Sequence, residues 1–258
     1  INLMTKTNKR LLFYSAVIIF LALSYVISLY AQGYRYDFSE NRFVRTGSIY
    51  LKANTDADVF LDNKLVGRTA FLGDSYLISN LLPGLYEVRL TKNDFSQWQK
   101  KILVEEGLVN EFSKILLVSK NEEEKELLAS EIEKLLYFSE PQKSDKFFIK
   151  GKMLYKRADS QPEKIADGVL GFSVSDDENK LAWWSANEFW VLWLRDAGYQ
   201  PYKKENDREL ITRLSTKIKT AAWFRGGDHA AVDVSDEKNK RYDILEIDKR
   251  GGINIIEI

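Results

Sequence analysis

The chain has 258 residues, of which 45% are hydrophobic, and its 38 basic side chains are balanced by 38 acidic ones. This length and apolar content allow about two folded domains, and the balanced charge argues against a nucleic-acid-binding surface. There is no cysteine, which excludes disulfides, thiolate nucleophiles and cysteine zinc sites. The many aromatic and β-branched clusters after the N-terminal segment favour β-structure there.

The first element in chain order is an uncharged segment over residues 11–31, LLFYSAVIIFLALSYVISLYA. As a helix it spans about 30 Å, which is the thickness of the hydrocarbon core of a bilayer. A cleaved signal peptide would have a shorter apolar region and a better cleavage site than SLYAQG. A buried core helix would need another long helix to pack against. We therefore predict an uncleaved transmembrane helix whose partner is the lipid bilayer.

The charges that flank this helix predict its orientation. Basic residues are equally frequent on both sides within about 15 residues: Lys6, Lys9, Arg10, Arg35, Arg42 and Arg45. Only Lys9 and Arg10 adjoin the apolar segment, whereas an aromatic belt follows it, made of Tyr30, Tyr34 and Tyr36. We predict that residues 1–10 are a cytoplasmic tail, that 32–45 are a juxtamembrane linker and that 33–258 are extracytoplasmic.

Residues 46–118 contain short strand patterns separated by turn residues: GSIYLKA, DVFLD, SYLISNL, YEVRLTK, WQKKILV and NEFSKILLV. In YEVRL the apolar residues face one side while Glu87 and Arg89 face the other, as in a half-buried antiparallel strand. Asp62 and Asn63 tolerate a left-handed backbone and predict a hairpin turn. The pattern predicts a small antiparallel β-sandwich.

Two stretches of this region, GSIYLKANTDADVFLDNKLVGRTAF and LLPGLYEVRLTKNDFSQWQKKILVEEG, resemble a PEGA domain, a small β-sandwich module of bacterial and archaeal envelope-associated proteins. The matching positions are Ala57, Val59, Asp62, Gly67, Thr69, Pro83, Gly84, Tyr86 and Trp98. The sequence departs from the pattern at Ala70, where a proline usually stands, and it lacks the Glu-Gly-Ala part of the name motif. The resemblance implies no catalytic residue.

Residues 121–138, NEEEKELLASEIEKLLYF, show the pattern of an amphipathic helix. Asn121 is suited to cap its start, and the acidic residues that follow suit the positive end of a helix. The apolar residues at helical spacing are Leu128, Ile132, Leu135 and Leu136. We predict a linker helix that packs on a neighbouring domain, because the segment is too short for a coiled-coil dimer.

Residues 140–258 are β-rich and repetitive. GKMLYKRA, NKLAWWSA and DHAAVDVS each place a polar turn before an apolar strand, and the polar loop Arg195–Glu209 lengthens one repeat beyond a blade period of about 40–45 residues. The segment resembles the WD40-like or TolB-like β-propeller that follows a PEGA module in some membrane-anchored bacterial proteins. A closed propeller needs at least four blades, but only two to three fit here. We predict an incomplete propeller, either a fragment of a longer protein or a few blades in an open sheet.

The candidate chemical motifs lack the partners that they need. Gly73–Ser75 resembles the nucleophile block of GDS hydrolases, but the only histidine, His229, has a glycine where the assisting aspartate would stand. A single histidine without cysteine excludes common zinc sites. Asp176–Glu178, and Asp56 with Asp58, lack the ligand pattern of a calcium loop. We predict turns at these places, a surface or turn position for His229, and no catalytic residue, cofactor or metal.

Four tryptophans lie close together in the sequence: Trp183, Trp184, Trp190 and Trp193. Exposed tryptophan faces stack on sugars or peptides, so these residues are a candidate binding platform. Apolar residues on both faces of FWVLWL instead indicate a strand buried between blades. The sequence favours core packing over the platform.

The sequence therefore predicts a mainly β protein with an N-terminal transmembrane helix, a small antiparallel β-sandwich, a linker helix and partial β-propeller-like repeats. The predicted function is that of a non-enzymatic, membrane-anchored cell-envelope protein. Its PEGA module would be a spacer or docking domain, and its repeats would bind a protein, peptide or glycan partner rather than nucleic acid. The alternative is the anchoring or sensor part of a larger membrane enzyme whose catalytic region is absent from this chain.

Overall fold

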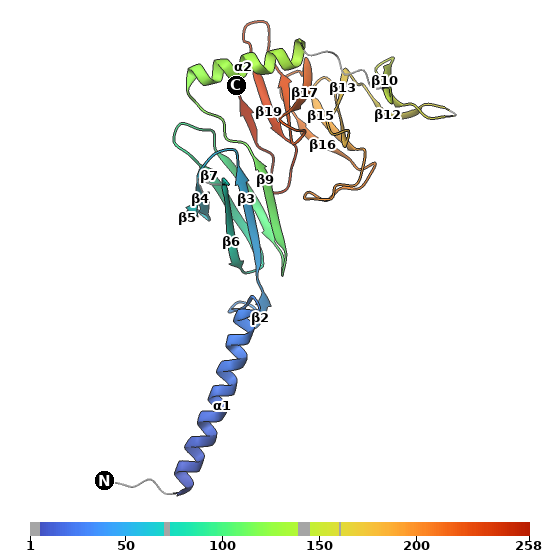
Figure 1. Ribbon diagram of the computed structural model, residues 1–258. Helices are drawn as coiled ribbons and strands as arrows, with labels where there is room; N and C mark the ends of the chain where they lie inside the picture. The colour runs from blue at the N-terminus through green and yellow to red at the C-terminus, as the bar shows by residue number, and fades with distance from the viewer. Residues whose placement is uncertain (1–5, 70–72, 139–144, 160) are drawn as a thin grey trace. The chain divides into compact units, whose positions relative to one another are not determined.

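The computed structural model describes residues 6–69, 73–138, 145–159 and 161–258 (Figure 1). Part of the predicted tail, position Ala70 and the start of the predicted repeats lie outside the described residues. The described chain is mainly β, with several small sheets, one apolar N-terminal helix and a second helix. These elements confirm the predicted fold class at that level.

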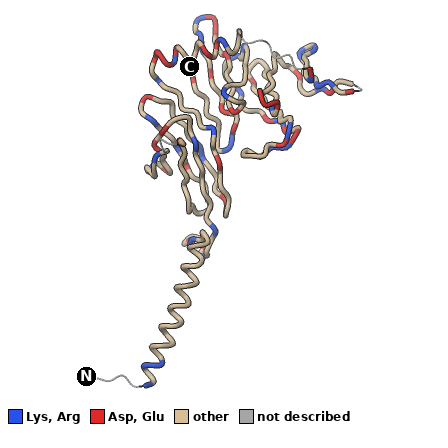
Figure 2. Tube along the Cα trace, in the orientation of Figure 1, with Lys and Arg blue, Asp and Glu red and all other residues tan. Residues whose placement is uncertain are grey.

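Helix α1 (Lys6–Ala31) contains the predicted apolar segment, and none of its residues is buried. Figure 2 shows that its charged residues are confined to its N-terminal end. It is the one described helix that is long and apolar enough to cross a membrane. A helix with no polar face and no protein cover is suited to lipid rather than to water.

The strands that follow form a hairpin and two sheets. Their bounds are β1 (Tyr34–Asp37), β2 (Arg42–Arg45), β3 (Gly47–Ala53), β4 (Asp58–Leu61), β5 (Lys64–Arg68), β6 (Ser75–Leu81), β7 (Gly84–Thr91), β8 (Trp98–Val104) and β9 (Val109–Ile115). β1 pairs with β2, and the two sheets have the strand orders β6-β3-β9 and β5-β4-β7-β8. The hairpin lies in the segment predicted to be a juxtamembrane linker.

Alternating burial gives each of these sheets one buried face. Along β3 and β8 every second residue is buried, as the period of two in a strand requires. The rings of Trp98 in β8 and Phe112 in β9 pack edge to face at 5.5 Å. The hydrogen bonds Ser48 N to Leu108 O and Asn54 N to Ile115 O show that β3 and β9 run in the same direction. The region predicted to be a small antiparallel sandwich therefore contains one parallel pair of strands.

Helix α2 (Glu122–Tyr137) confirms the predicted amphipathic helix. The side chain of Asn121 accepts a hydrogen bond from Glu124 N at 3.2 Å, which caps the first turn. Leu128 and Ile132 are its buried residues, four apart on one face.

The remaining strands form three antiparallel sheets in which neighbours in sequence are neighbours in space. Their bounds are β10 (Phe147–Lys150), β11 (Met153–Lys156), β12 (Glu163–Asp167), β13 (Gly171–Val174), β14 (Lys180–Trp184), β15 (Glu188–Trp193), β16 (Arg208–Arg213), β17 (Thr220–Phe224), β18 (His229–Asp233), β19 (Tyr242–Glu246) and β20 (Ile255–Glu257). The sheets are β10 to β12, β13 to β16 and β17 to β20. The three repeated sequence patterns give β11, β14 and β18, each the second strand of its sheet.

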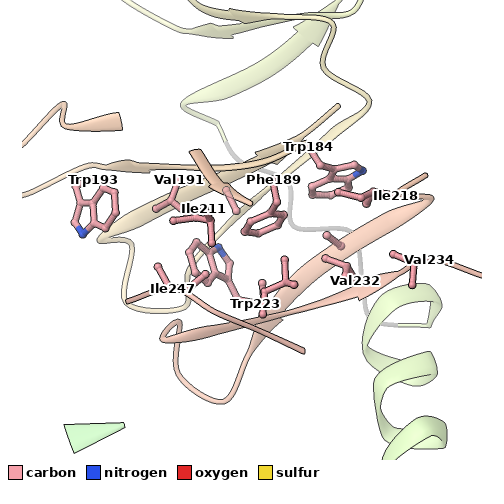
Figure 3. Close-up of a cluster of buried hydrophobic side chains, with 14 residues drawn as sticks. Trp184, Phe189, Val191, Trp193, Ile211, Ile218, Trp223, Val232, Val234 and Ile247 are labelled. Carbon is pink, nitrogen blue, oxygen red and sulfur yellow. The ribbon is translucent and has the colours of Figure 1, made fainter. Parts of the chain in front are cut away.

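Three hydrophobic clusters hold these sheets and α2 in one succession of layers. The first joins the β10–β12 sheet to the β13–β16 sheet. The second joins β13–β16 to β17–β20 through large side chains such as Phe189 and Trp223 (Figure 3). The third packs α2, through Leu128 and Ile132, on the other face of β17–β20. No closed barrel or propeller occurs in the described chain, and α2 covers the face of the β17–β20 sheet that is turned away from β13–β16.

Candidate functional site

The four clustered tryptophans lie on both faces of one sheet. Trp183, Trp184 and Trp193 are 4%, 6% and 2% exposed, and Trp190 is half-buried. Trp183 and Trp190 stack at 5.8 Å on the face toward β10–β12, whereas Trp184 and Trp193 lie in the cluster toward β17–β20. The rings thus pack between layers and do not form a common exposed face.

The PEGA-like positions in the β4–β5 hairpin have structural roles. Asp62 and Asn63 form its turn with positive φ values of 48° and 63°. Asp62 Oδ1 accepts a hydrogen bond from Glu87 N at 2.9 Å, which ties this turn to β7. A Cβ at Gly67 would meet the ring of Tyr76 at 2.3 Å, so only glycine leaves room for that ring.

The other positions that carry the resemblance to a PEGA domain lie in or beside the sheet β5-β4-β7-β8. Thr69 Oγ1 accepts from Ala57 N at 2.7 Å, and Thr69 N donates to Ala57 O at 2.9 Å, which closes the base of the hairpin. Val59 and Trp98 are buried. Pro83 directly precedes β7, and Gly84 and Tyr86 lie on it.

The candidate hydrolase and calcium motifs form turns and ion pairs. Asp74 has a φ of 47° at the entry to β6, as a turn residue does. Asp177 Oδ1 accepts from Ser175 Oγ and Asn179 N within the turn before β14. Among the described residues no group of three or more His, Cys, Asp or Glu side chains is placed to hold a metal ion.

The carboxylate of Asp56, one of the candidate calcium ligands, is paired with two cations. Lys92 Nζ lies 2.8 Å from Asp56 Oδ1, and Arg68 Nη2 lies 2.5 Å from Asp56 Oδ2. Hydrogen bonds from Lys92 and then Arg68 lower the pKa of Asp56 to about 2. This carboxylate is therefore already neutralised by protein groups.

The expected surface position of His229 is wrong. His229 begins β18, which lies inside the four-stranded sheet between β17 and β19, and it is only 6% exposed. Burial lowers the pKa of His229 to about 4 against an ordinary value of 6.5. The imidazole is therefore neutral at pH 7. The sequence of β18 alone does not indicate that this histidine is buried.

Sequence reasoning missed a group of buried charges that joins β8 to the β17–β20 sheet. Lys100 Nζ lies 3.1 Å from Glu246 Oε2 and donates to the carbonyl oxygens of Gly252, at 2.8 Å, and Asp248. Glu246 also accepts from Trp98 Nε1 at 3.1 Å and from Asn254 Nδ2 at 2.8 Å. Burial raises the pKa of the Glu246 carboxyl above its ordinary value, against the opposing effect of Lys100.

Further polar groups line a small cavity beside this group. The cavity has a volume of about 40 Å³, and Glu111, Lys180, Gln200 and Asp228 are among its lining residues. Lys180 Nζ pairs with Asp228 Oδ1 at 3.2 Å and donates to Gly227 O at 2.7 Å. The volume suits about one water molecule rather than an organic substrate.

The C-terminal end of α1 is a candidate site, because the predicted apolar segment ends there and the structure shows a hydrogen-bonded junction at the same place. Gly33 follows the helix with a φ of 85°, as a C-terminal cap glycine does. Arg35 Nη1 donates to the helix carbonyl of Tyr30 at 3.0 Å, and its guanidinium lies 4.6 Å from the centre of the Tyr30 ring. Thr46 donates to Gly33 O through its backbone N at 2.9 Å and through Oγ1 at 2.7 Å. The apolar helix thus ends in a closed, hydrogen-bonded junction with the β1–β2 hairpin.

No protein-family model matches the sequence, and no curated protein matches it.

Proposed function

We propose that this chain is a non-enzymatic protein of the cell envelope, anchored in a membrane by α1. Residues 1–10 lie in the cytoplasm and 33–258 outside it. The observation that carries the proposal is a helix of 26 residues with no buried side chain, uncharged from Leu11 to Ala31. Exposing that surface to water costs far more than placing it in lipid.

In this proposal residues 46–118 are a PEGA-like sandwich that acts as a spacer or docking module. Two residues of the motif support this proposal by their packing and hydrogen bonds. Gly67 leaves space for the ring of Tyr76, and Thr69 binds Ala57 at the base of the β4–β5 hairpin. The buried group around Lys100 and Glu246 fastens β8 to the β17–β20 sheet. A spacer needs such a stiff attachment, because a loose one would not hold the next module at a fixed distance from the membrane.

The β-rich layers after α2 are the proposed partner-binding part, for an envelope protein, a peptide or a glycan. The repeated sheets with sequential strands support the propeller-like interpretation. The tryptophans of β14 and β15 pack between the sheets and do not form a binding surface. The proposed partner therefore contacts the loops and the sheet edges. The absence of an enzymatic role is proposed because the buried charged groups Lys100 and Glu246 bind each other and nearby protein atoms, which leaves neither group for a substrate.

The anchor is tested by extracting membranes that contain the full chain with alkaline carbonate. We expect the protein to stay in the pellet and to enter the supernatant only with detergent. The double substitution Ile19→Arg and Leu23→Arg places two charges near the middle of α1, each costing about 2.5–3.5 kcal/mol there, and we expect it to release the protein. The control is Leu103→Arg at an exposed leucine of β8. Wild-type protein in the supernatant without detergent would refute the proposal.

A further inference from the structure

The β1–β2 hairpin has two chemically different faces. Its register pairs Tyr36 with Phe43 on one face, and it pairs Asp37 with Arg42 on the other. The first face, which also carries Tyr34 and Arg45, is called the aromatic face, and the second, which also carries Arg35 and the buried Val44, is called the charged face.

The aromatic face forms a cluster with the last turn of α1. Tyr36 packs edge to face with Phe43 at 5.3 Å and with Phe38 at 5.0 Å, and Phe43 packs with Tyr30 of α1 at 6.3 Å. We call these four residues the aromatic cluster. Phe38, at the turn of the hairpin, is 84% exposed. A phenylalanine held in this way costs free energy in water unless another apolar phase covers it.

Two arginines of the charged face donate hydrogen bonds to β6 and to the turn between β8 and β9. Arg35 Nη2 donates to Asn80 Oδ1 of β6 at 2.9 Å. Arg42 Nη2 donates to Glu106 Oε1, in the turn between β8 and β9, at 3.2 Å. These bonds tie the charged face to β6 and to the β8–β9 turn, and Arg35 also contacts the last turn of α1 through the carbonyl and the ring of Tyr30.

The length of α1 sets the height of the hairpin. An apolar helix over residues 11–31 uses the full hydrocarbon thickness of about 30 Å, so its C-terminal end lies where the headgroups begin. β1 starts at Tyr34, directly after the Gly33 cap. The headgroup layer is about 5–7 Å deep on each side, and the contacts of Arg35 and Phe43 with Tyr30 hold the hairpin against the last turn of α1. The hairpin must therefore lie at the lipid surface if α1 spans the bilayer.

We infer that the β1–β2 hairpin is a second membrane contact, in which the aromatic cluster lies in the interface of the bilayer and Phe38 enters the boundary between headgroups and acyl chains. The inference rests on the proposed membrane span of α1. Tyrosine and other aromatic rings favour this zone, where one edge is apolar and the other is hydrated.

The natural absence of cysteine allows a direct test with single labelling sites. Full-length Phe38→Cys and Ser39→Cys proteins are labelled with an environment-sensitive fluorophore and reconstituted in phosphatidylcholine vesicles with acyl chains brominated near the headgroup. Phe38→Cys removes the side chain that is proposed to enter the bilayer and could for that reason abolish the contact. Ser39→Cys retains Phe38 and reports on the same turn. The matched control is Leu127→Cys, at an exposed leucine of α2. We expect blue-shifted emission and strong bromine quenching at position 38 or 39, and neither at 127.

The result separates this inference from the anchor on which it rests. Carbonate-resistant protein whose labels at 38 and 39 are both unquenched overturns the hairpin contact and leaves the anchor intact. Protein that does not enter vesicles at all refutes the anchor itself. Equal quenching at 127 also overturns the inference, because the contact would then not be confined to the hairpin.

Discussion

The buried lysine of β8 provides a sharp test of how the two β-rich regions are joined. Lys100→Met keeps most of the length of the side chain and removes its charge. The side chain of Lys100 is 0% exposed, and its ammonium group serves Glu246 and the carbonyl oxygens of Gly252 and Asp248. The substitution leaves the Glu246 carboxylate, itself only 8% exposed, without its cation.

The expected loss in the free energy of unfolding follows from that stranded charge. Removing one partner of a buried ion pair costs about 3–5 kcal/mol, because the remaining charge stays desolvated. Lys101→Met is the matched control, since Lys101 is exposed on the opposite face of β8 and its backbone N keeps its bond to Gly251 O. A surface substitution of this kind changes stability by less than about 0.5 kcal/mol.

Guanidinium unfolding of the full chain in a non-ionic detergent, followed by the fluorescence of its six tryptophans, measures both variants. Adding Glu246→Gln to Lys100→Met removes the stranded charge, and the double mutant should recover about 1–3 kcal/mol relative to additivity. Equal and small effects of Lys100→Met and Lys101→Met would refute the joining role. Strict additivity in the double mutant would refute the ion pair.

Three further substitutions test other parts of the structure. Gly67→Val should lower the unfolding free energy by about 1–3 kcal/mol, because its side chain overlaps the ring of Tyr76; an unchanged denaturation midpoint would contradict this packing. Ile132→Ala, at 0% exposure in α2, should cost about 2–5 kcal/mol, whereas Leu127→Ala at an exposed position of the same helix should cost little. Because the folded chain binds a proton at His229 only below about pH 4 and the unfolded chain does so below 6.5, stability should fall as pH drops through that window, by up to about 3 kcal/mol. His229→Gln should remove this component, and a wild-type minus variant difference that is independent of pH would contradict it.

The elements that depend on local sequence were predictable. Asp62 and Asn63 mark a hairpin turn because few other residues adopt positive φ at low cost. Asn121 marks the start of α2 for a similarly local reason. The burial of the tryptophans followed from apolar residues on both faces of β15, and the structure adds which ring lies on which face.

The features that depend on distant residues were not predictable. Lys100 occupies an inward position in WQKKILV, and this break in the alternation is the one local sign of a buried ion pair. Its partner Glu246 belongs to another sheet, so the sequence of neither strand predicts that these two residues form an ion pair. The sequence predicts a surface or turn position for His229 for the same reason, since the layers that bury it come from elsewhere in the chain. The sequence of residues 32–45 predicts only a linker, because the bonds between Thr46 and Gly33 that close the hairpin join residues at its two ends.

Protease protection on sealed vesicles of known orientation tests the central claim of a single anchor with the β-rich part on one side. In vesicles whose outer surface is the extracytoplasmic face, added protease should digest residues 33–258 and leave a protected fragment that contains α1. Vesicles of the opposite orientation should protect all but the short tail. A chain that is digested only in the opposite orientation, or one that leaves no protected fragment in either, would contradict the account.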